Sequence, residues 1–398
     1  MSNEDKNEDW EDLDAIDEEY ETWKSNLDQM YGMVFEEEFK ESFMTVQWLP
    51  GSETSKEGIT KQRVIYGTLE QKKNELYVGE IEAQFQGKES KGEVKHKPEL
   101  KTLRKIPHEG DVNRARYNPK KSDIVATANE NGTIQLFNIQ DGKKVLQDLK
   151  KHEANAFGLA WSSDHQLVTG CDNGLITRWD ALKGSVIHTY EVMHPETPKE
   201  PAGVNDIAYQ WHEGETTQLF AAVSESGYVH FFDSRQDGSQ AANVFKAHDE
   251  AANSISFNPF SSYLYATAST DSSVGIWDLR FTKTRLHSLL GHSSSVQSLD
   301  WNPFLSNILM SASDDRRVLL WDITRIGQEQ TPEDIEDGAP EVLFMHGGHK
   351  HSVHDVSWNP EHEWCVASVA GDLSLQVWRP LDQIVSPVDA TVKNSQLE

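Results

Sequence analysis

The segment from Gly291 to Asp322 constrains the fold most, because its pattern of apolar and turn-forming residues recurs along the chain. It contains three short runs in which apolar and polar residues alternate, and this period of two is typical of half-buried strands. The runs cover residues 296–301, 308–311 and 317–321. Gly-His, Asn-Pro and Asp-Asp pairs, all turn-forming types, separate them. The segment therefore predicts most of one four-stranded antiparallel sheet.

Four side chains in this segment, those of His292, Ser313, Asp315 and Trp321, have the spacing of a structural repeat. They resemble the WD repeat, in which a histidine, a serine, a turn aspartate and a tryptophan form one hydrogen-bonded chain across a blade. Buried histidine and aspartate side chains are costly unless they are hydrogen bonded, which explains the spacing as a packing requirement. We therefore expect a structural role, although these residue types also occur in catalytic triads.

Copies of this unit follow one another at a spacing of about 40 residues, as in WD-repeat propellers. They open at or near His108, His152, Val204, His248, His292 and His349, and they close at Phe137, Trp179, Phe232, Trp277, Trp321 and Trp378. Strand-like runs at 43–50, 63–69 and 75–81 form a degenerate first copy. Seven copies complete a ring, so the sequence predicts an all-β fold, a seven-bladed WD-repeat β-propeller.

The predicted ring has two irregular features. The units that end in Phe137 and Phe232 lack the tryptophan, so their hydrogen-bonded chains should be incomplete. A strand from one terminus should join the first and last blades, because an open ring would leave an unpaired sheet edge. The local pattern does not show which residues form that strand.

The N-terminal region changes character near Ile16. Residues 1–14 are almost all acidic or polar, so we expect a disordered tail. From Ile16 to Val34 the apolar residues recur at helical spacing, which predicts an amphipathic helix of about five turns packed on the side of the propeller. The predicted organisation is an acidic tail (1–14), a helix (15–38), the propeller (39–385) and a C-terminal tail (386–398).

The formal net charge of −28 over 398 residues indicates a basic protein partner. Such a charge repels nucleic acid and acidic membrane surfaces, so we expect neither to bind directly. Cys171 and Cys365 are too few for a disulfide framework and lie in repeat strands, which favours an intracellular protein. No apolar run approaches membrane-spanning length, and no phosphate-binding or zinc-binding motif is present. We therefore expect no cofactor and no metal.

One insertion, at residues 326–345, is much longer than the other connections between repeats. Its centre carries Glu333, Asp334, Glu336 and Asp337 around Ile335, and residues 327–345 include no basic side chain. Long connections in compact repeat proteins are usually functional or disordered. The apolar run at 342–345 predicts a strand that anchors the far end, which favours a function.

Several segments together resemble the retinoblastoma-binding histone chaperones. They are DEEYETWKSN (17–26), TVQWLP (45–50), HEGDVNRARYNP (108–119), IWDLR (276–280) and IGQEQTPEDIEDGAPEVLFMHGGH (326–349). That family includes the WD-repeat subunits of type B histone acetyltransferase, of chromatin assembly factor one and of several deacetylase and methyltransferase complexes. The resemblance covers nearly the whole chain from Asp17 onward.

This resemblance implies a non-catalytic subunit that binds histone H4, as H3–H4, and joins histone-modifying or chromatin-assembly partners. It implies a nuclear location, with the cytoplasm as a second one. In relatives, the N-terminal helix and the acidic loop form a groove for the first helix of histone H4. The corresponding residues here are Leu27, Met30, Tyr31, Val34, Glu333, Asp334, Ile335, Glu336 and Asp337.

Relatives also bind the histone H3 tail on the top face of the ring. The residues that keep a suitable type here are Asp111, Asn113, Phe157 and Asn253. At four other positions relatives tend to carry three carboxylates and an aromatic side chain, whereas this chain has Asn155, Asn205, Gln297 and Gly371. Each lost charged hydrogen bond should weaken tail binding by roughly 1–3 kcal/mol. The resemblance therefore predicts weak or absent tail binding on this face.

Two other interpretations concern short motifs. The WDLR and FDSR motifs, which end at Arg280 and Arg235, resemble the paired motif by which propellers dock on the adaptor of cullin-based ubiquitin ligases. A ligase substrate receptor is therefore the alternative function. The histidines between His346 and His354 suggest a metal site, but His349 belongs to its blade and the others should point in different directions. We expect no enzymatic activity.

Overall fold

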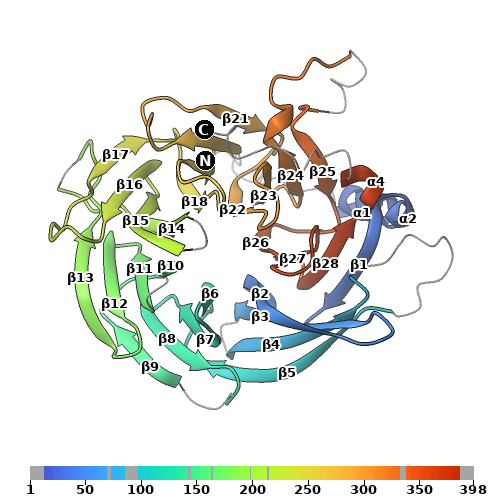
Figure 1. Ribbon diagram of the computed structural model, residues 1–398, viewed down its shortest axis with the longest axis horizontal. Helices are drawn as coiled ribbons and strands as arrows, with labels where there is room; N and C mark the ends of the chain where they lie inside the picture. The colour runs from blue at the N-terminus through green and yellow to red at the C-terminus, as the bar shows by residue number, and fades with distance from the viewer. Residues whose placement is uncertain are drawn as a thin grey trace, which may run out of the picture.

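The computed structural model describes residues 13–69, 73–85, 97–141, 145–162, 165–197, 199–212, 215–331 and 338–385. In this part of the chain, seven four-stranded antiparallel sheets surround a central axis (Figure 1). This arrangement confirms the predicted seven-bladed β-propeller with an N-terminal helix at its side. The predicted groove residues at 333–337 lie outside the described residues.

Six blades use four consecutive strands, numbered from the axis outward. Blade one contains β2 (Ser42–Thr54), β3 (Thr60–Leu69), β4 (Asn74–Ala83) and β5 (Glu99–His108). Blade two contains β6 (Arg114–Asn118), β7 (Lys121–Ala128), β8 (Thr133–Asn138) and β9 (Val145–Lys150). Blade three contains β10 (Ala156–Trp161), β11 (Gln166–Cys171), β12 (Leu175–Asp180) and β13 (Ser185–Glu191).

The second half of the ring repeats this arrangement. Blade four contains β14 (Val204–His212), β15 (Glu215–Ser224), β16 (Tyr228–Asp233) and β17 (Asn243–Lys246). Blade five contains β18 (Ala252–Phe257), β19 (Leu264–Ser269), β20 (Ser273–Asp278) and β21 (His287–Leu290). Blade six contains β22 (Val296–Trp301), β23 (Ile308–Ser313), β24 (Val318–Asp322) and β25 (Val342–His346). Blade seven contains β26 (Val353–Trp358), β27 (Val366–Ala370), β28 (Ser374–Pro380) and, from the N-terminal region, β1 (Tyr31–Glu38).

Strand β1 closes the ring by pairing antiparallel with β28, with Val34 opposite Trp378 and Phe35 opposite Val377. The prediction of one helix extending to residue 38 is therefore wrong. Helix α1 (Leu13–Ser25) ends much earlier, and the four-residue α2 (Leu27–Met30) leads directly into β1. The apolar residues after Met30 also fit a period of two, and pairing satisfies the outer edge of blade seven that a helix would leave open.

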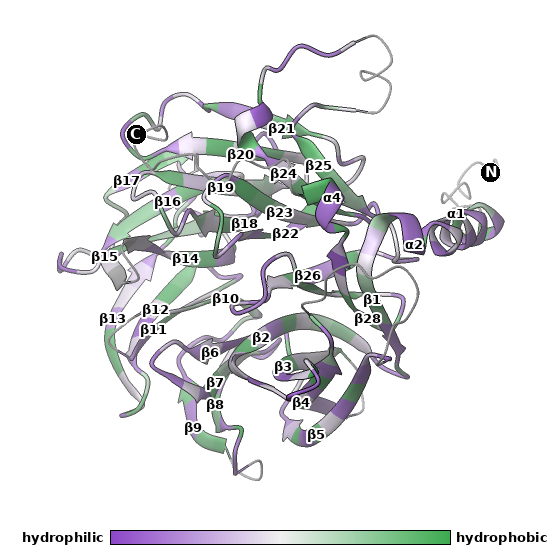
Figure 2. Cartoon of the chain, turned by 45° about the vertical axis from the view of Figure 1, so that its right-hand side comes forward, coloured by the Kyte–Doolittle hydropathy of each residue, from purple (hydrophilic) through white to green (hydrophobic). Residues whose placement is uncertain are grey.

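Helix α1 packs on the side of the ring through Ile16, Tyr20 and Trp23, which are buried and share one face. The Trp23 indole N–H donates a hydrogen bond of 2.9 Å to the Tyr31 hydroxyl, and that hydroxyl lies 2.9 Å from Nδ1 of His346. Figure 2 shows α1 and α2 beside β1, β28 and the short helix α4 (Asp382–Val385). These contacts attach the N-terminal region to both blade six and blade seven.

The predicted polar chain in blade six exists, but its serine is Ser311 and not Ser313. Nδ1 of His292 lies 2.8 Å from the Asp315 carboxylate, and Nε2 lies 2.7 Å from the Ser311 hydroxyl. The Trp321 indole N–H donates to that same hydroxyl at 2.7 Å. Ser313 lies at the end of β23, where its hydroxyl donates to the backbone carbonyl of Ser294, in the connection before β22.

The same chain recurs in other blades. The tryptophan indole donates to a serine or threonine ten positions earlier at Thr169, Thr267 and Ser368, as it does at Ser311. In blade two His108 still bonds Thr127 at 2.7 Å, but Phe137 has no N–H to donate. The chain of blade two is therefore incomplete, as the sequence predicted.

Candidate functional site

A surface of partly buried apolar side chains lies where the N-terminal and C-terminal segments meet on the side of the ring. It consists of Leu27 on α2, Met30 at the end of α2, Val34 on β1 and Ile384 on α4. The backbone N–H of Leu381 donates 2.9 Å to the carbonyl of Met30, which attaches α4 to α2. We call these four apolar side chains the side surface.

The side surface rests on a rigid layer of aromatic rings. The rings of Tyr31 and Phe344 meet edge-on at 5.2 Å, and His346 stacks on Trp378 at 4.4 Å. Tyr31 is only 6% exposed, and burial raises the pKa of its phenol well above the usual value. Tyr31 therefore supports the side surface from below and, contrary to the prediction, offers little area to a partner. Leu27, Met30 and Val34 remain partly accessible.

A hollow of about 600 Å³ continues from Met30 along α1 toward blade six. One wall is the exposed face of α1, with Glu18, Glu19 and Thr22, and the opposite wall includes Met345. Glu19 forms an ion pair of 3.2 Å with Arg316 across the hollow. Arg316 and Arg317 also line the hollow, so the α1 carboxylates there face two cations of the protein itself. The methionine side chains of Met30 and Met345 can adapt to different apolar partners.

The acidic insertion begins and ends on blade six, at the other end of β24 and β25 from the residues that line the hollow. Its first residues follow the short 3₁₀ helix η1 (Ile323–Arg325), and β25 begins at Val342, which confirms the strand predicted at 342–345. The backbone N–H of Asp322 donates 2.8 Å to the carbonyl of Glu341, so the two ends are held together. Glu333, Asp334, Ile335, Glu336 and Asp337 themselves lie outside the described residues.

Sequence reasoning missed several residues of this region. Ile384 follows the last repeat, where no repeat pattern remains, and Met345 was assigned only to an anchoring strand. Glu18 and Glu19 could have been found from helical spacing, because Glu18 lies opposite the face of Ile16, Tyr20 and Trp23 and Glu19 lies at its edge. Those acidic positions were not distinguished from the acidic tail that precedes them.

Comparisons with known proteins connect this arrangement with a family. Residues 18–83, from α1 through β4, match a model of the histone-binding protein RBBP4 and its counterpart in the CAF1 complex. Residues 341–379 match the WD domain, G-beta repeat, and two stretches match propeller models named for EIPR1 (196–321) and for anaphase-promoting complex subunit 4 (115–213).

Three relatives that align over most of the chain are named histone acetyltransferase type B subunit 2. The Kluyveromyces lactis protein is 37% identical over 398 residues, covering 94% of each chain. The Debaryomyces hansenii protein is 34% identical over 380 residues, covering 92% of this chain and 90% of its own. The Candida glabrata protein is 34% identical over 386 residues, covering 92% and 88%. The chain belongs to the histone-binding WD-repeat family.

The residues expected to form a second site, on the top face, make hydrogen bonds within the ring. The Asn113 amide donates to Asn155 at 2.6 Å and to the carbonyl of Ala156 at 3.0 Å. Asn253 likewise donates 3.0 Å to the carbonyl of Val296 in the next blade. These amides link neighbouring blades, so their donors already have partners within the ring.

The remaining top-face residues are dispersed. Asp111 lines a separate hollow of about 700 Å³ together with Glu75 and Glu130. Phe157 is partly exposed on β10. The Gln297 amide donates 2.7 Å to Asp314. This arrangement is consistent with the predicted weak tail binding, which stays a prediction.

The two arginines of the alternative docking motif are engaged within their own blades. Arg235 forms an ion pair of 2.6 Å with Asp233, and Arg280 forms one of 2.8 Å with Asp278. The Arg280 guanidinium also lies 4.3 Å from the centre of the Tyr263 ring. Both arginines therefore have a local structural role, which is the alternative explanation to adaptor docking for the two motifs.

The histidine-rich segment is likewise accounted for by the fold. His349 bonds Ser368 at 2.8 Å in the blade-seven chain, and Nδ1 of His354 lies 2.8 Å from the carbonyl of Phe43. Among the described residues no group of three or more histidine, cysteine, aspartate or glutamate side chains could hold a metal ion. None of the helices in the described ranges is long and apolar enough to cross a membrane.

Proposed function

We propose that this protein is a non-catalytic histone chaperone or scaffold subunit that binds the first helix of histone H4 along the side surface and the adjoining hollow. The observation that carries the proposal is the combination of partly accessible apolar side chains at Leu27, Met30 and Val34 with the carboxylates of α1, on the side of the ring where blade six carries the acidic insertion. An amphipathic basic helix fits such a groove: apolar anchors supply affinity, and surrounding carboxylates select basic side chains.

In this proposal the protein presents H3–H4 to histone-modifying or chromatin-assembly partners in the nucleus. The names of the relatives, subunits of a type B histone acetyltransferase, support a role beside a catalytic subunit. The acidic insertion, with Glu333, Asp334, Glu336 and Asp337 around Ile335, would enclose the bound helix from the blade-six side. The ligase-receptor alternative has less support, because Arg235 and Arg280 are paired with aspartates of their own blades.

The test is titration of a peptide containing the first helix of H4 against the wild-type protein and a variant with the four insertion carboxylates changed to amides. We expect the variant to bind about 30-fold more weakly, since four peripheral charges at about 0.5 kcal/mol each contribute about 2 kcal/mol. The matched control changes four exposed carboxylates elsewhere, those of Glu53, Glu57, Asp237 and Glu250, to amides. Equal binding by wild type and insertion variant, or no binding by folded wild type, would overturn the proposal.

A further inference from the structure

The central channel contains a polar cluster to which the seven innermost strands contribute. A small cavity of about 140 Å³ is lined by one or more residues from each of these strands, including Arg114, Asp206 and Asp300. Beyond it, at the carboxyl ends of the strands, the channel widens into a cavity of about 440 Å³. We call this larger cavity the channel pocket. The top-face residues Asp111 and Asn253 lie near the opposite, amino-terminal ends of the innermost strands.

Six of the seventeen residues that line the channel pocket are aromatic. Its aromatic residues are Tyr117, Trp161, Tyr209, Trp211, Phe257 and Trp301. The Trp161 indole N–H donates 2.9 Å to the carbonyl of Arg116, and the Trp301 indole N–H donates 3.1 Å to the carbonyl of Ser256. Each bond fixes an indole ring against the neighbouring blade, so the pocket has a pre-formed wall.

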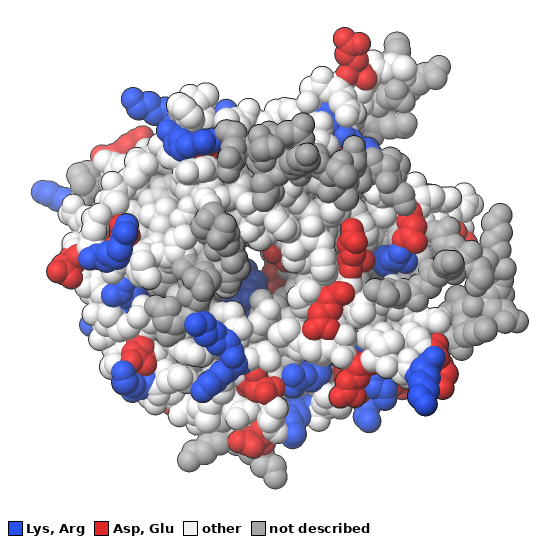
Figure 3. Space-filling view, viewed as in Figure 1, with Lys and Arg blue, Asp and Glu red and all other residues white. Residues whose placement is uncertain are grey.

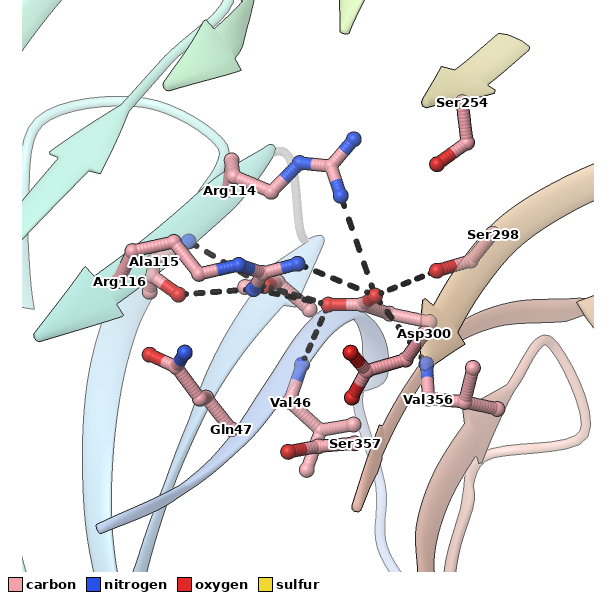
Figure 4. Close-up of polar contacts among 12 residues, drawn as sticks. Val46, Gln47, Arg114, Ala115, Arg116, Ser254, Ser298, Asp300, Val356 and Ser357 are labelled. Carbon is pink, nitrogen blue, oxygen red and sulfur yellow. Dashed lines mark hydrogen bonds and ion pairs between the residues drawn. The ribbon is translucent and has the colours of Figure 1, made fainter. Parts of the chain in front are cut away.

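Above the pocket, two arginines are matched by two carboxylates, those of Asp206 and Asp355. Figure 4 shows Arg114 and Arg116 of this cluster together with Asp300. Arg116 contacts both oxygens of Asp355, at 3.1 and 3.3 Å, and Arg114 lies 3.4 Å from Asp206 and 3.9 Å from Asp355. Burial works against charge at Asp355, but Arg116 and Arg114 outweigh it and hold the pKa of that carboxyl below its usual value. The two guanidinium groups are therefore already neutralised.

Asp300 is a third carboxylate, and it lines both the small cavity and the channel pocket. Its side chain accepts a hydrogen bond of 3.1 Å from the backbone N–H of Trp358. Among the described residues, no lysine, arginine or histidine nitrogen forms an ion pair with Asp300 within 4.0 Å. When Asp300 is ionised, the cluster thus has one more negative than positive charge.

The surroundings of Asp300 disfavour its charge in the absence of a ligand. Burial raises the pKa of Asp300 to about 7, and the nearby Asp355 carboxylate raises it further. The Trp358 N–H and the Arg116 guanidinium lower this pKa, but they do not offset the burial. Tyr117, whose own pKa is raised by burial and by Asp300, lies on the same strand as Arg116. A cation beside Asp300 would supply the missing charge.

We propose that the channel pocket binds an alkylammonium group, supplied as one lysine side chain of a partner peptide, with the ammonium group facing Asp300 and the alkyl stem against the aromatic wall. An ammonium group is attracted by carboxylates and by the faces of tryptophan and tyrosine rings. A neutral apolar ligand should bind poorly, because it would bury the Asp300 carboxyl further without pairing it. An anion should also bind poorly, because Asp300 would repel it and the neighbouring arginines already have carboxylate partners. This site is separate from the side surface and does not depend on histone H4 binding there.

The test uses the full-length protein, with the tryptophan indole N–H signals observed by NMR during titration. The probes are n-butylammonium, its neutral counterpart 1-butanol, and the capped peptide Ala-Ala-Lys-Ala-Ala with lysine unmodified or trimethylated. We expect the ammonium probe and the peptides, but not 1-butanol, to shift the signals of Trp161, Trp211 and Trp301. Affinity should rise about tenfold from pH 6 to pH 8, because a carboxyl with a pKa of about 7 goes from about one-tenth to nine-tenths ionised.

Variants distinguish a specific site from general attraction. Asp300→Asn should weaken ammonium binding at least tenfold and remove its pH dependence, whereas the exposed control Asp237→Asn should bind as wild type does. Trp211→Leu, at a partly exposed position of the wall, should also weaken binding and provides a second variant if Asp300→Asn does not fold. Equal binding of 1-butanol, unchanged affinity in both variants, or shifts at other tryptophans would overturn the site. Binding of n-butylammonium without binding of either peptide would overturn the peptide as its source.

Discussion

A single hydroxyl group joins the buried polar chain of blade six. The Ser311 hydroxyl accepts from the Trp321 indole N–H and lies against Nε2 of His292, each at 2.7 Å. Because Nδ1 of His292 faces the Asp315 carboxylate and donates to it, Nε2 is the acceptor for the serine proton. Both the indole and the imidazole would lose a partner if this hydroxyl were removed.

We expect Ser311→Ala to lower the free energy of unfolding by about 2–4 kcal/mol, since an unsatisfied buried polar group costs about 1–3 kcal/mol. Ser313→Ala is the matched control, because Ser313 is also fully buried, but its hydroxyl bonds to backbone groups, the Ser294 carbonyl and the Asp315 N–H, each at 3.1 Å. That variant should lose about 1 kcal/mol. Urea unfolding of the three proteins measures the difference, and an equal or larger loss for Ser313→Ala would contradict the assignment.

Strand β1 is the element that determines whether the ring is closed. Met33 and Phe35 are buried in a cluster with blade one and blade seven, while Val34, on the other face, is only partly buried beside the aromatic layer under the side surface. If the same residues formed a helix, Val34 would be buried and Phe35 exposed, because Val34 belongs to the helical stripe of apolar residues and Phe35 does not. The strand and the helix therefore predict opposite effects for substitutions at Val34 and Phe35.

We expect Phe35→Asp to destabilise the protein by at least about 3 kcal/mol, because it removes a buried ring and places an unpaired carboxylate in the core. Val34→Asp should cost about 1 kcal/mol or less in stability, as for a partly exposed position, but should weaken H4-peptide binding. Denaturant unfolding and peptide titration of both variants provide the measurement. A larger stability loss for Val34→Asp would support the helix instead of the strand.

The contrast between the repeats and β1 shows what local sequence can reveal about elements. The unit at Gly291–Asp322 was predictable because alternation and turn residues are local signals, and its three strands appear at β22, β23 and β24. The residues of β1 fit both helical and strand periods, and their partner β28 is more than 300 residues away. The side surface was found only in part for the same reason, because Ile384 joins it through the fold alone.

At the scale of the whole molecule, the negative charge is unevenly distributed along the chain. Residues 1–12 contain six acidic residues and one lysine, and residues 332–337 contain four acidic residues and no basic one. On the described surface seen in Figure 3, acidic and basic side chains are interspersed around the ring. These two short segments carry net charges of −5 and −4 out of −28 for the whole chain, and they adjoin α1 and blade six in sequence.

If these segments attract basic histones, salt should act mainly on the rate of association. We expect the association rate constant for the H4 peptide to fall about tenfold between 50 and 300 mM salt, while the dissociation rate constant changes little, because screening shortens the range of attraction before contact. Stopped-flow fluorescence with a labelled peptide measures both constants. The variant with Glu333, Asp334, Glu336 and Asp337 changed to amides should show a shallower salt dependence than the variant with four exposed carboxylates neutralised elsewhere. A salt effect confined to dissociation would mean that the carboxylates act as contacts in the bound complex and do not steer the encounter.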